Sequence, residues 1–293
     1  MTRCLTLPPV VALCRLLARM PQRVLLWSAS VASFLLWPVL ARRRRIARIN
    51  IDLCFPGLSA NERRRLLRAN QRETVMGMFE LMRAWFAPAR QLVAVADIEG
   101  LDRLREALAR GRGVLLFTGH FTHTELAVRL LSEALGRPVR TVVRRHNQPC
   151  IEREFERARS RVFGATLAKK DTRGLLRALQ SGEAVVYSAD QDFSYQNEFV
   201  PFFGIAAATL VSTPELVRRA GAEMMPFWFH RAADGRYRLF IEPMWPGWSE
   251  GDPANSAAIY MRELEVQVRK HPEQYLWVHR RFKTRRPGVP SVY

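Results

Sequence analysis

The sequence is poor in lysine and in cysteine, and each scarcity narrows the possible functions. Only four of its 46 basic residues are lysines, so arginine carries most of the formal net charge of +19. A planar guanidinium binds phosphate and carboxylate groups well. The charge therefore indicates an anionic partner: a phospholipid surface, a phosphorylated substrate, an acidic protein or nucleic acid. The four cysteines form no C-x-x-C pair and do not cluster with histidines, so we expect no zinc site.

The sequence also lacks internal repeats, low-complexity linkers and a G-x-S-x-G nucleophile motif. A length of 293 residues fits one large domain, or one domain with a helical N-terminal extension. Hydrophobic residues make up 48% of the chain, which is enough for a sizeable core and argues against global disorder.

One long run near the N-terminus carries no charge. Residues 24–41 form an uncharged stretch of 18 residues with Trp27 and Trp37 near its ends, and four arginines follow at 42–45. Such a run is near the lower limit for crossing a bilayer, and tryptophans and flanking arginines are typical of membrane segments. The sequence therefore predicts a membrane anchor. A buried core helix and a cleaved signal peptide are the alternatives that this pattern leaves open. Residues 5–20 are expected to lie in the membrane interface.

The rest of the chain predicts an α/β fold with a mostly parallel central sheet flanked by helices, preceded by the N-terminal membrane-anchoring helical segment. Residues 46–86 are expected to be helical, with a capping box formed by Ser59 and Glu62. Strands then alternate with helices, which is typical of a parallel sheet. We predict membrane-anchoring or interfacial helices over residues 1–45 and a catalytic domain over 46–293, divided into a helical part (46–96) and an α/β core (97–293). The expected strands cover 114–117, 139–143, 184–188, 224–229 and 237–241.

His120 is the strongest candidate for chemistry, because it follows a predicted strand by three residues. Catalytic groups gather where strands of such sheets end. Glu125, five residues further on, is expected in the first turn of a helix, where its carboxylate can orient one ring nitrogen. No serine nucleophile motif is present and Cys150 has no supporting motif, so we expect the base to act directly on a substrate hydroxyl. His123 is a competing base. A metal site of His120, His123 and Glu125 is a further alternative, although the H-E-x-x-H spacing is absent.

Residues 119–125, with the sequence GHFTHTE, match an H-x4-[DE] motif (HX4E). This motif resembles that of the glycerolipid and lysophospholipid acyltransferases. More narrowly, nearly the whole chain resembles the late (secondary) acyltransferases of lipid A biosynthesis. The matching segments, in order along the chain, are 42–50, 53–56, 189–192, 199–204 and 272–283.

The resemblance implies an enzyme on the cytoplasmic face of the bacterial inner membrane that needs no metal or organic cofactor. It would transfer a fatty acyl chain from an acyl carrier protein to a hydroxyl of a hydroxyacyl chain on a phosphorylated lipid acceptor, a lipid A precursor of the Kdo-lipid IVA type. His120 would be the general base and Glu125 its orienting carboxylate.

Five further residues are predicted to bind substrate. Arg144 and Arg145 lie in the family's arginine-bearing segment, where either one is suited to bind a phosphate or a developing oxyanion. Asp190 matches a family aspartate, and the alternative is that it only ends a strand. Arg280 and Arg281 would meet the anionic lipid, and surface packing is their alternative role.

Two other functions remain open from the sequence. Residues 122–124 depart from the family's commoner G-N-W, and their hydroxyl-bearing side chains resemble the subgroup that acts on the tetra-acylated precursor. A lysophospholipid or aminolipid is a separate, alternative acceptor. A basic, non-catalytic binder of membrane or nucleic acid belongs to another class. We find no nucleic-acid-binding module in the sequence, so nucleic acid is not an expected partner.

Overall fold

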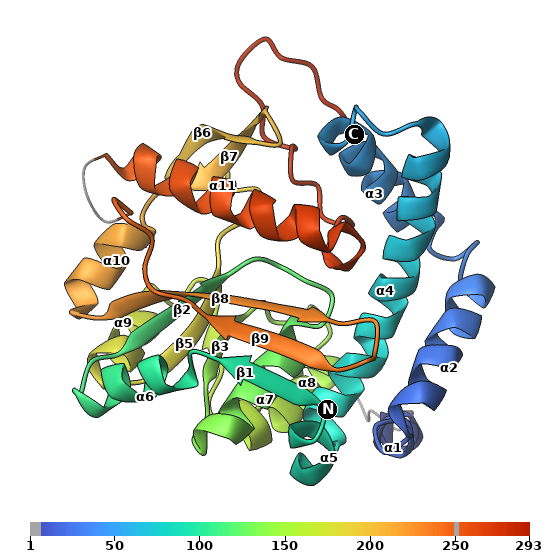
Figure 1. The fold of residues 1–293 in the computed structure, drawn as a ribbon, viewed down its shortest axis with the longest axis horizontal. Coiled ribbons are helices and arrows are strands. Elements are labelled where there is room, and N and C mark those ends of the chain that lie inside the picture. Colours follow the sequence, from blue (N-terminus) through green and yellow to red (C-terminus); the bar gives the residue numbers. More distant parts are fainter. Residues whose placement is uncertain (1–6, 249–251) are drawn as a thin grey trace.

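A seven-stranded sheet forms the centre of the molecule in the computed structural model, which describes residues 7–248 and 252–293 (Figure 1). The strand order is β1-β9-β8-β2-β5-β3-β4. Neighbours pair in parallel except β8 and β9, which form an antiparallel hairpin. The strands are β1 (Ala96–Glu99), β2 (Val114–Thr118), β3 (Arg140–Val143), β4 (Leu167–Ala168), β5 (Ala184–Ser188), β8 (Glu223–Arg231) and β9 (Tyr237–Ile241). The strands β6 (Asn197–Phe202) and β7 (Ile205–Leu210) form a separate antiparallel ribbon.

Helices lie on both sides of this sheet (Figure 1). Helix α11 lies on one side, and α6 and α7 lie on the other. The helices are α1 (Leu7–Leu17), α2 (Gln22–Leu35), α3 (Ala41–Cys54), α4 (Ala60–Phe86), α5 (Ala89–Val93), α6 (Leu101–Ala109), α7 (Thr124–Leu135), α8 (Pro149–Phe163), α9 (Thr172–Gln180), α10 (Thr213–Ala220) and α11 (Pro253–Lys270), with a 3-10 turn at Pro272–Gln274. The predicted α/β fold with a mostly parallel sheet is confirmed.

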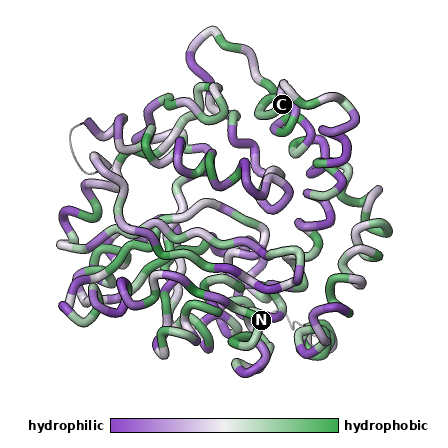
Figure 2. Tube along the Cα trace, in the orientation of Figure 1, coloured by the Kyte–Doolittle hydropathy of each residue, from purple (hydrophilic) through white to green (hydrophobic). Residues whose placement is uncertain are grey.

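Strand β2 lies inside the sheet, between β5 and β8. All five of its residues are buried, as expected for a parallel strand with helices over both faces. The tube coloured by hydropathy shows the strongly hydrophobic segments running through the sheet, with hydrophilic segments on the outer helices (Figure 2). This buried centre gives rigid support to the loops that leave its carboxyl edge.

The N-terminal run 24–41 does not form one helix. Helix α2 ends at Leu35 and α3 begins at Ala41, so the arginines at 42–45 lie in the first turns of α3. Pro38 lies between the two helices, and proline disfavours helical backbone at the residue before it. Among residues 7–248 and 252–293, no helix is both long and apolar enough to cross a bilayer. The predicted membrane-spanning helix is therefore not supported.

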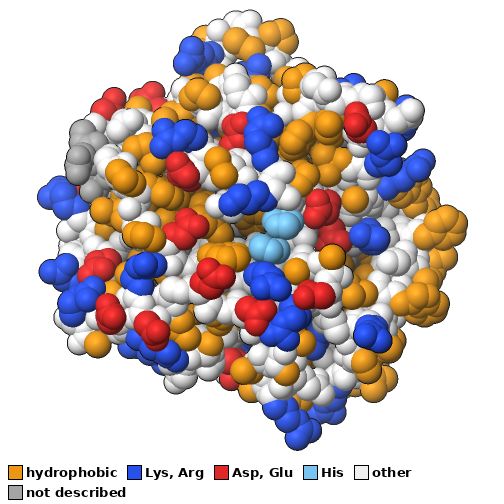
Figure 3. Space-filling view, in the orientation of Figure 1, with side chains coloured by type: hydrophobic (Ala, Val, Ile, Leu, Met, Phe, Trp, Pro, Cys, Tyr) orange, Lys and Arg blue, Asp and Glu red, His pale blue; other side chains and the backbone are white. Residues whose placement is uncertain are grey.

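Large apolar side chains remain exposed on these N-terminal helices. On α2, Trp27 is 69% exposed and Phe34 is 80% exposed. In the space-filling view, hydrophobic side chains gather along the right-hand edge of the molecule, over α2 (Figure 3). The predicted boundary between an anchor and a catalytic domain at residues 45 and 46 falls inside α3, and that division stays a prediction.

Helix α4 connects the N-terminal helices to the sheet. It begins with the predicted capping box, in which Ser59 and Glu62 each accept a hydrogen bond from the other's backbone N–H. Further along, α4 contacts α2, α3, α7 and α8 and the 3-10 turn. At Gly77 the helix approaches the loop after β2 so closely that a Cβ atom would lie 2.4 Å from the Thr122 carbonyl oxygen. Helix α4 therefore braces the loop that carries His120.

Candidate active site

His120 and Asp190 meet at the carboxyl edge of the sheet. His120 follows β2 and Asp190 follows β5, and these two strands pair in parallel with Thr118 opposite Ser188. His120 and Asp190 each follow this Thr118–Ser188 pair by two residues. Because parallel strands end at the same edge, this register brings the imidazole and the carboxylate together.

The Asp190 carboxylate makes hydrogen bonds with three groups. Its Oδ1 lies 2.5 Å from Nδ1 of His120, and its Oδ2 accepts from the His120 backbone N–H at 2.9 Å. The Tyr275 hydroxyl donates to the same Oδ2 at 2.8 Å. The His120 side chain is 33% exposed, whereas that of Asp190 is 1% exposed. The buried carboxylate therefore holds a partly exposed imidazole in one orientation.

The pKa of Asp190 determines the tautomer of this pair. Burial alone would raise the pKa of the Asp190 carboxyl, but the charge and hydrogen bonds of His120, with the Tyr275 hydroxyl, hold it well below its usual range. The ionised carboxylate can only accept hydrogen bonds, which assigns the proton to Nδ1 of His120. In the neutral form of the ring, Nε2 then has a lone pair that can receive a proton from a substrate.

A late segment of the chain forms one wall of this site. Phe121 and Tyr275 form a β-bridge, the Thr122 N–H donates to the Gln274 carbonyl at 2.9 Å, and the Leu276 N–H donates to the His120 carbonyl at 3.0 Å. The loop after β2 therefore has a defined backbone partner on both sides of Phe121.

Two amide side chains hold that late segment against the N-terminal helices. Asn70 on α4 donates to the carbonyls of Glu273 and Tyr275, both at 2.8 Å. Asn50 on α3 donates to the carbonyls of Trp277 and His279, both at 2.7 Å. The wall of the site thus depends on packing between α3, α4 and residues 273–279.

Glu125 does not hydrogen-bond His120 in the part of the chain that the structure describes. It lies in the first turn of α7, as expected, but its carboxylate accepts from Trp85 Nε1 at 2.6 Å and from Arg159 at 2.8 Å. The cation of Arg159 and the indole N–H draw this carboxylate toward α4 and α8. The predicted His120–Glu125 hydrogen bond is corrected to a His120–Asp190 bond, and a catalytic role of Glu125 stays a prediction.

His123 is a poor candidate for the base. It is 2% exposed, and its ring packs against the rings of Phe229 and Tyr237. Burial, together with the nearby Arg231, His230 and His271, lowers the pKa of His123 well below its usual value, so the ring is neutral. Over the described residues, no three His, Cys, Asp or Glu side chains are grouped in a way that would hold a metal ion.

The predicted substrate-binding arginines occupy different environments. Arg144 and Arg145 are exposed just after β3, which is the neighbour of β5, and Arg280 is also exposed. Arg281 is 2% exposed, and its guanidinium donates to the Ala208 carbonyl at 2.7 Å and to the Thr209 hydroxyl at 2.5 Å. The contacts of Arg281 are therefore with the protein itself, and substrate contact by any of the four arginines stays a prediction.

The arrangement as a whole is a histidine base with a buried orienting carboxylate at the edge of an α/β sheet, a type of site suited to proton removal from a hydroxyl. Comparison with known proteins gives the class. The family model described as "Bacterial lipid A biosynthesis acyltransferase" matches residues 2–284. The chain belongs to this family, and it is an acyltransferase.

Individual relatives agree with this assignment. The chain is 38% identical over 279 residues to the lipid A biosynthesis palmitoleoyltransferase of Escherichia coli (strain K12), covering 94% of this chain and 90% of the relative. It is 36% identical to the lipid A biosynthesis lauroyltransferase of the same strain, covering 86% and 83%. A lipid A biosynthesis acyltransferase of Haemophilus influenzae is 33% identical, covering 86% and 81%. The alternative of a non-catalytic binding protein is thereby excluded.

Proposed function

We propose that this acyltransferase moves a fatty acyl chain from an acyl carrier protein to a hydroxyl of a hydroxyacyl chain on a lipid A precursor of the Kdo-lipid IVA type. The observation that carries the proposal is the His120 imidazole, which bonds the buried Asp190 carboxylate and remains partly exposed. Membership of the lipid A acyltransferase family supports the class of acceptor.

The reaction follows from the protonation states of the pair. Nε2 of His120 takes the proton of the acceptor hydroxyl while the hydroxyl oxygen attacks the thioester carbonyl carbon. The ionised Asp190 stabilises the imidazolium that forms. The tetrahedral intermediate then expels the carrier thiolate, which receives the proton from Nε2. An ester bond replaces the thioester, and no covalent acyl-enzyme is needed.

Glu125 acts in this proposal as a positioning residue. Its ion pair with Arg159 and its bond from Trp85 tie the first turn of α7 to α8 and α4. The His120 loop leads directly into α7, so these bonds help to fix where the loop ends. Glu125 therefore contributes through the position of His120 and does not touch the substrate.

The proposed location is the cytoplasmic face of the inner membrane, with the exposed apolar side chains of α1 and α2 in the lipid interface. Leu13 and Leu16 on α1 are 54% and 65% exposed, and Trp27 and Phe34 on α2 are more exposed still. Apolar surface of this kind, next to the arginines of α3, suits an interface of acyl chains and anionic headgroups.

Acyl transfer by the purified protein tests the proposal. Labelled acyl–acyl carrier protein and a tetra-acylated, phosphorylated lipid A precursor should yield a penta-acylated product, and His120→Ala should abolish turnover without unfolding the protein. His146→Ala, at an exposed histidine in another loop, is the matched control and should retain activity. Full activity of the His120 variant would rule out the assignment of the base.

The acceptor is tested separately by offering a lysophospholipid and an aminolipid beside the lipid A precursor at equal concentrations. Preferential acylation of the lipid A precursor supports the proposal. Preferential acylation of either alternative would replace the proposed acceptor while leaving the chemistry at His120 unchanged.

A further inference from the structure

Three cavities share His279 as a lining residue. The inference drawn from them rests on the proposed function and concerns the place where the acceptor lipid binds. The first, which we call the apolar cavity, lies between α3, α4 and residues 276–278 and has a volume of about 390 Å³. Ligand pockets usually have volumes of about 300 Å³ or more, so this cavity is large enough to bind a ligand. Its walls include Leu40, Ala47, Leu67, Thr74, Leu276 and Val278.

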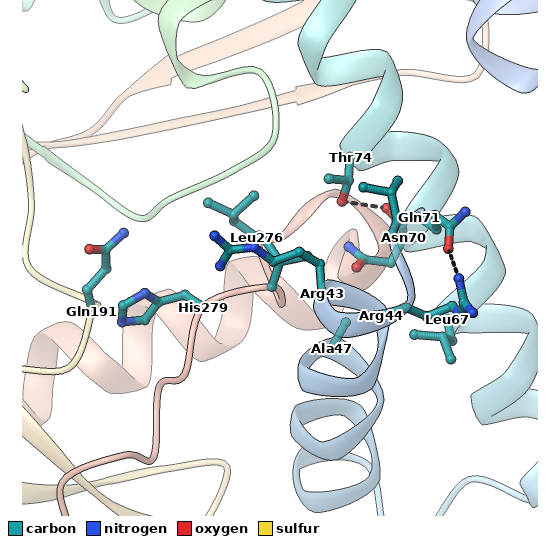
Figure 4. A pocket seen from close by; sticks show the side chains of 12 residues that line it. Arg43, Arg44, Ala47, Leu67, Asn70, Gln71, Thr74, Gln191, Leu276 and His279 are labelled. Atoms are coloured by element: carbon teal, nitrogen blue, oxygen red, sulfur yellow. Dashed lines mark hydrogen bonds between the residues drawn. The ribbon is translucent and has the colours of Figure 1, made fainter. Parts of the chain in front are cut away.

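The apolar cavity adjoins the catalytic pair. A small cavity next to His120 and Asp190 shares three lining residues with it, Gln191, Leu276 and His279. Figure 4 shows Gln191 and His279 on one side of the apolar cavity and the α4 side chains Asn70 and Thr74 on the other. The cavity beside His120 has a volume of only about 10 Å³, so the hydrocarbon of a bound chain would lie in the adjoining apolar cavity, close to His120.

The third, cationic cavity is lined by Arg42, Arg43, Arg280 and Lys283, and it shares Arg43 and His279 with the apolar cavity. Its volume is also about 390 Å³. Asp192 is the acidic residue among its lining residues, and that carboxylate already accepts two hydrogen bonds from Thr284, each at 2.9 Å. The four cations are thus poorly neutralised by the protein.

Arg43 and Arg44 differ in a way that selects Arg43 as the ligand-binding residue. The Arg44 guanidinium stacks 4.0 Å from the centre of the Trp37 ring and donates to Gln71 at 3.3 Å. The Arg43 guanidinium makes no hydrogen bond or ion pair within residues 7–248 and 252–293. It extends from α3 toward Leu276 and His279 (Figure 4). Arg43 is therefore free to bind an anion at the junction of the two cavities.

We propose that these cavities bind the acceptor, with the hydrocarbon part of its hydroxyacyl chain in the apolar cavity and a phosphate of the same lipid in the cationic cavity. In a phosphorylated glycolipid the acyl chains and the phosphates leave the same sugar headgroup, and the reacting hydroxyl lies only a few bonds from that headgroup. A site that places this hydroxyl at His120 therefore needs an apolar cavity for the chain and a cationic cavity for the phosphate, and the two cavities must adjoin.

The acyl donor does not fit this arrangement. Its acyl chain and the phosphate of its carrier are separated by the long pantetheine arm, so that both cannot occupy adjoining cavities that meet at one residue. Only the acceptor has an acyl chain and a phosphate close to each other. The apolar cavity thus binds the chain of this lipid by hydrophobic burial, and the cationic cavity binds its phosphate by charge.

The role of the cationic cavity is tested with two synthetic glucosamine lipids in detergent micelles that bear the same hydroxyacyl chains, one phosphorylated and one not. Loss of a charge-assisted contact is worth about tenfold or more in affinity. Arg43→Gln should raise KM for the phosphorylated lipid by at least that factor, and should leave KM for the other lipid, KM for the donor and kcat unchanged. Arg48→Gln, at an exposed arginine on the same helix, is the matched control and should change none of these values.

The role of the apolar cavity is tested by filling it with a larger side chain. Thr74→Phe should lower kcat/KM by about tenfold or more for an acceptor with full-length hydroxyacyl chains and spare an analogue with shortened chains, because lost burial scales with chain length. Met78→Phe, at a position on the same helix that is 51% exposed, is the matched control and should behave as the parent. Val278→Phe, on the opposite wall, repeats the test if Thr74→Phe does not fold.

A change in the preferred donor chain length, in Thr74→Phe or Val278→Phe, would place the donor in the apolar cavity and overturn the proposal. An equal effect of Arg43→Gln on both acceptors, or an effect on the donor KM, would also overturn it. Equilibrium binding of the two glucosamine lipids to the His120→Ala protein separates this inference from the proposed function. Tighter binding of the phosphorylated lipid, lost in His120→Ala/Arg43→Gln, would support the site even if the wild-type protein acylated neither lipid, whereas equal binding would refute it.

Discussion

At the scale of single residues, the candidate site depends on the hydrogen bonds that the buried Asp190 carboxylate accepts. Asp190 is removed from water, and an isolated carboxylate in that position would protonate. Hydrogen bonds from the His120 ring, the His120 backbone and the Tyr275 hydroxyl keep it ionised instead. The same three bonds also fix the orientation of the imidazole. Charge stabilisation and orientation of the base are therefore functions of one side chain.

Comparison of Asp190→Asn with Glu125→Gln should identify the carboxylate that serves the base. Asp190→Asn should lower kcat by about 10³–10⁴-fold with little change in either KM, because the imidazolium loses its counter-charge and the correct tautomer is no longer enforced. Glu125→Gln should have a smaller effect, since its partners are Trp85 and Arg159. Steady-state kinetics of both variants give the answer. A larger loss of kcat in Glu125→Gln would restore the His120–Glu125 pairing.

The partly buried histidines His279 and His230 should make the protein less stable in mild acid. Burial lowers the pKa of His279 to about 4 and that of His230 to about 4. The unfolded chain, with ordinary histidine pKa values near 6.5, binds more protons than the folded protein between these values. The free energy of unfolding is therefore expected to be full above about pH 6.5 and to fall toward pH 4.

Urea unfolding at pH 7 and pH 5 measures this loss. His279→Gln should lose less stability between the two pH values than the parent, with His230 accounting for part of the loss that remains. His146→Gln is the control, because solvent reaches that side chain in the folded protein as well. An unchanged pH dependence in the His279 variant would show that this ring does not contribute.

At the scale of elements, the packing of α4 against the loop after β2 decides where His120 lies. Three features produce this contact: the capping box that starts α4, the absence of a side chain at Gly77, and the Asn70 amide that holds residues 273–275. Each is a local feature of the sequence. Their joint effect is to place a helix, a loop and a late segment of the chain around one imidazole.

Gly77→Ala should lower activity and stability together. The added methyl would lie 2.4 Å from the Thr122 carbonyl oxygen, a backbone atom that cannot rotate away. Overpacking of this kind costs about 1–3 kcal/mol, and the displaced loop should reduce kcat. Gly57→Ala is the matched control, because nothing lies within 4 Å of its Cβ position. Thermal unfolding and acyl transfer by both variants test this, and equal behaviour of the two would contradict the close contact.

Much of the element layout could be predicted from the sequence, and the reasons are local. The capping box at Ser59 depends on a few neighbouring residues, and it is present. The strand before His120 was also predictable as a short buried run. Local patterns of this kind do not depend on the order of strands in the sheet.

The partner of His120 could not be predicted in the same way. Glu125 was the nearer carboxylate in sequence, whereas Asp190 reaches the ring through the pairing of β2 with β5. Strand order is a long-range property that neither segment contains. The available signal was that Asp190, like His120, comes directly after a predicted strand. The break between α2 and α3 was indicated by Pro38, which lies within the run read as one span.

At the scale of the whole molecule, an apolar edge and a cationic site lie on related elements. The exposed apolar side chains of α2 precede the arginines of α3, and α3 also forms a wall of both the apolar and the cationic cavities. Attachment through α2 would therefore bring the cavities close to the headgroup layer that contains the acceptor. Binding to the membrane and binding of the substrate then use neighbouring parts of one surface.

The double variant Trp27→Asp/Phe34→Asp should weaken attachment to vesicles that contain anionic lipids by about tenfold or more, because each aspartate is costly in an apolar phase. Co-sedimentation with vesicles measures the bound fraction. Val289→Asp is the control, since Val289 is 42% exposed and lies outside α2. Undiminished sedimentation of the double variant, at equal stability, would show that α2 is not the attachment surface.

The bridge between Phe121 and Tyr275 has a consequence for the synthesis of the protein. His120 and Asp190 leave the ribosome well before the segment that supplies the Tyr275 hydroxyl and the backbone partner of the histidine loop. Contacts between segments so distant in the chain form late in folding. A nascent or prematurely terminated chain would therefore carry His120 and Asp190 without an ordered site, and we expect it to consume no acyl donor before its folding is complete.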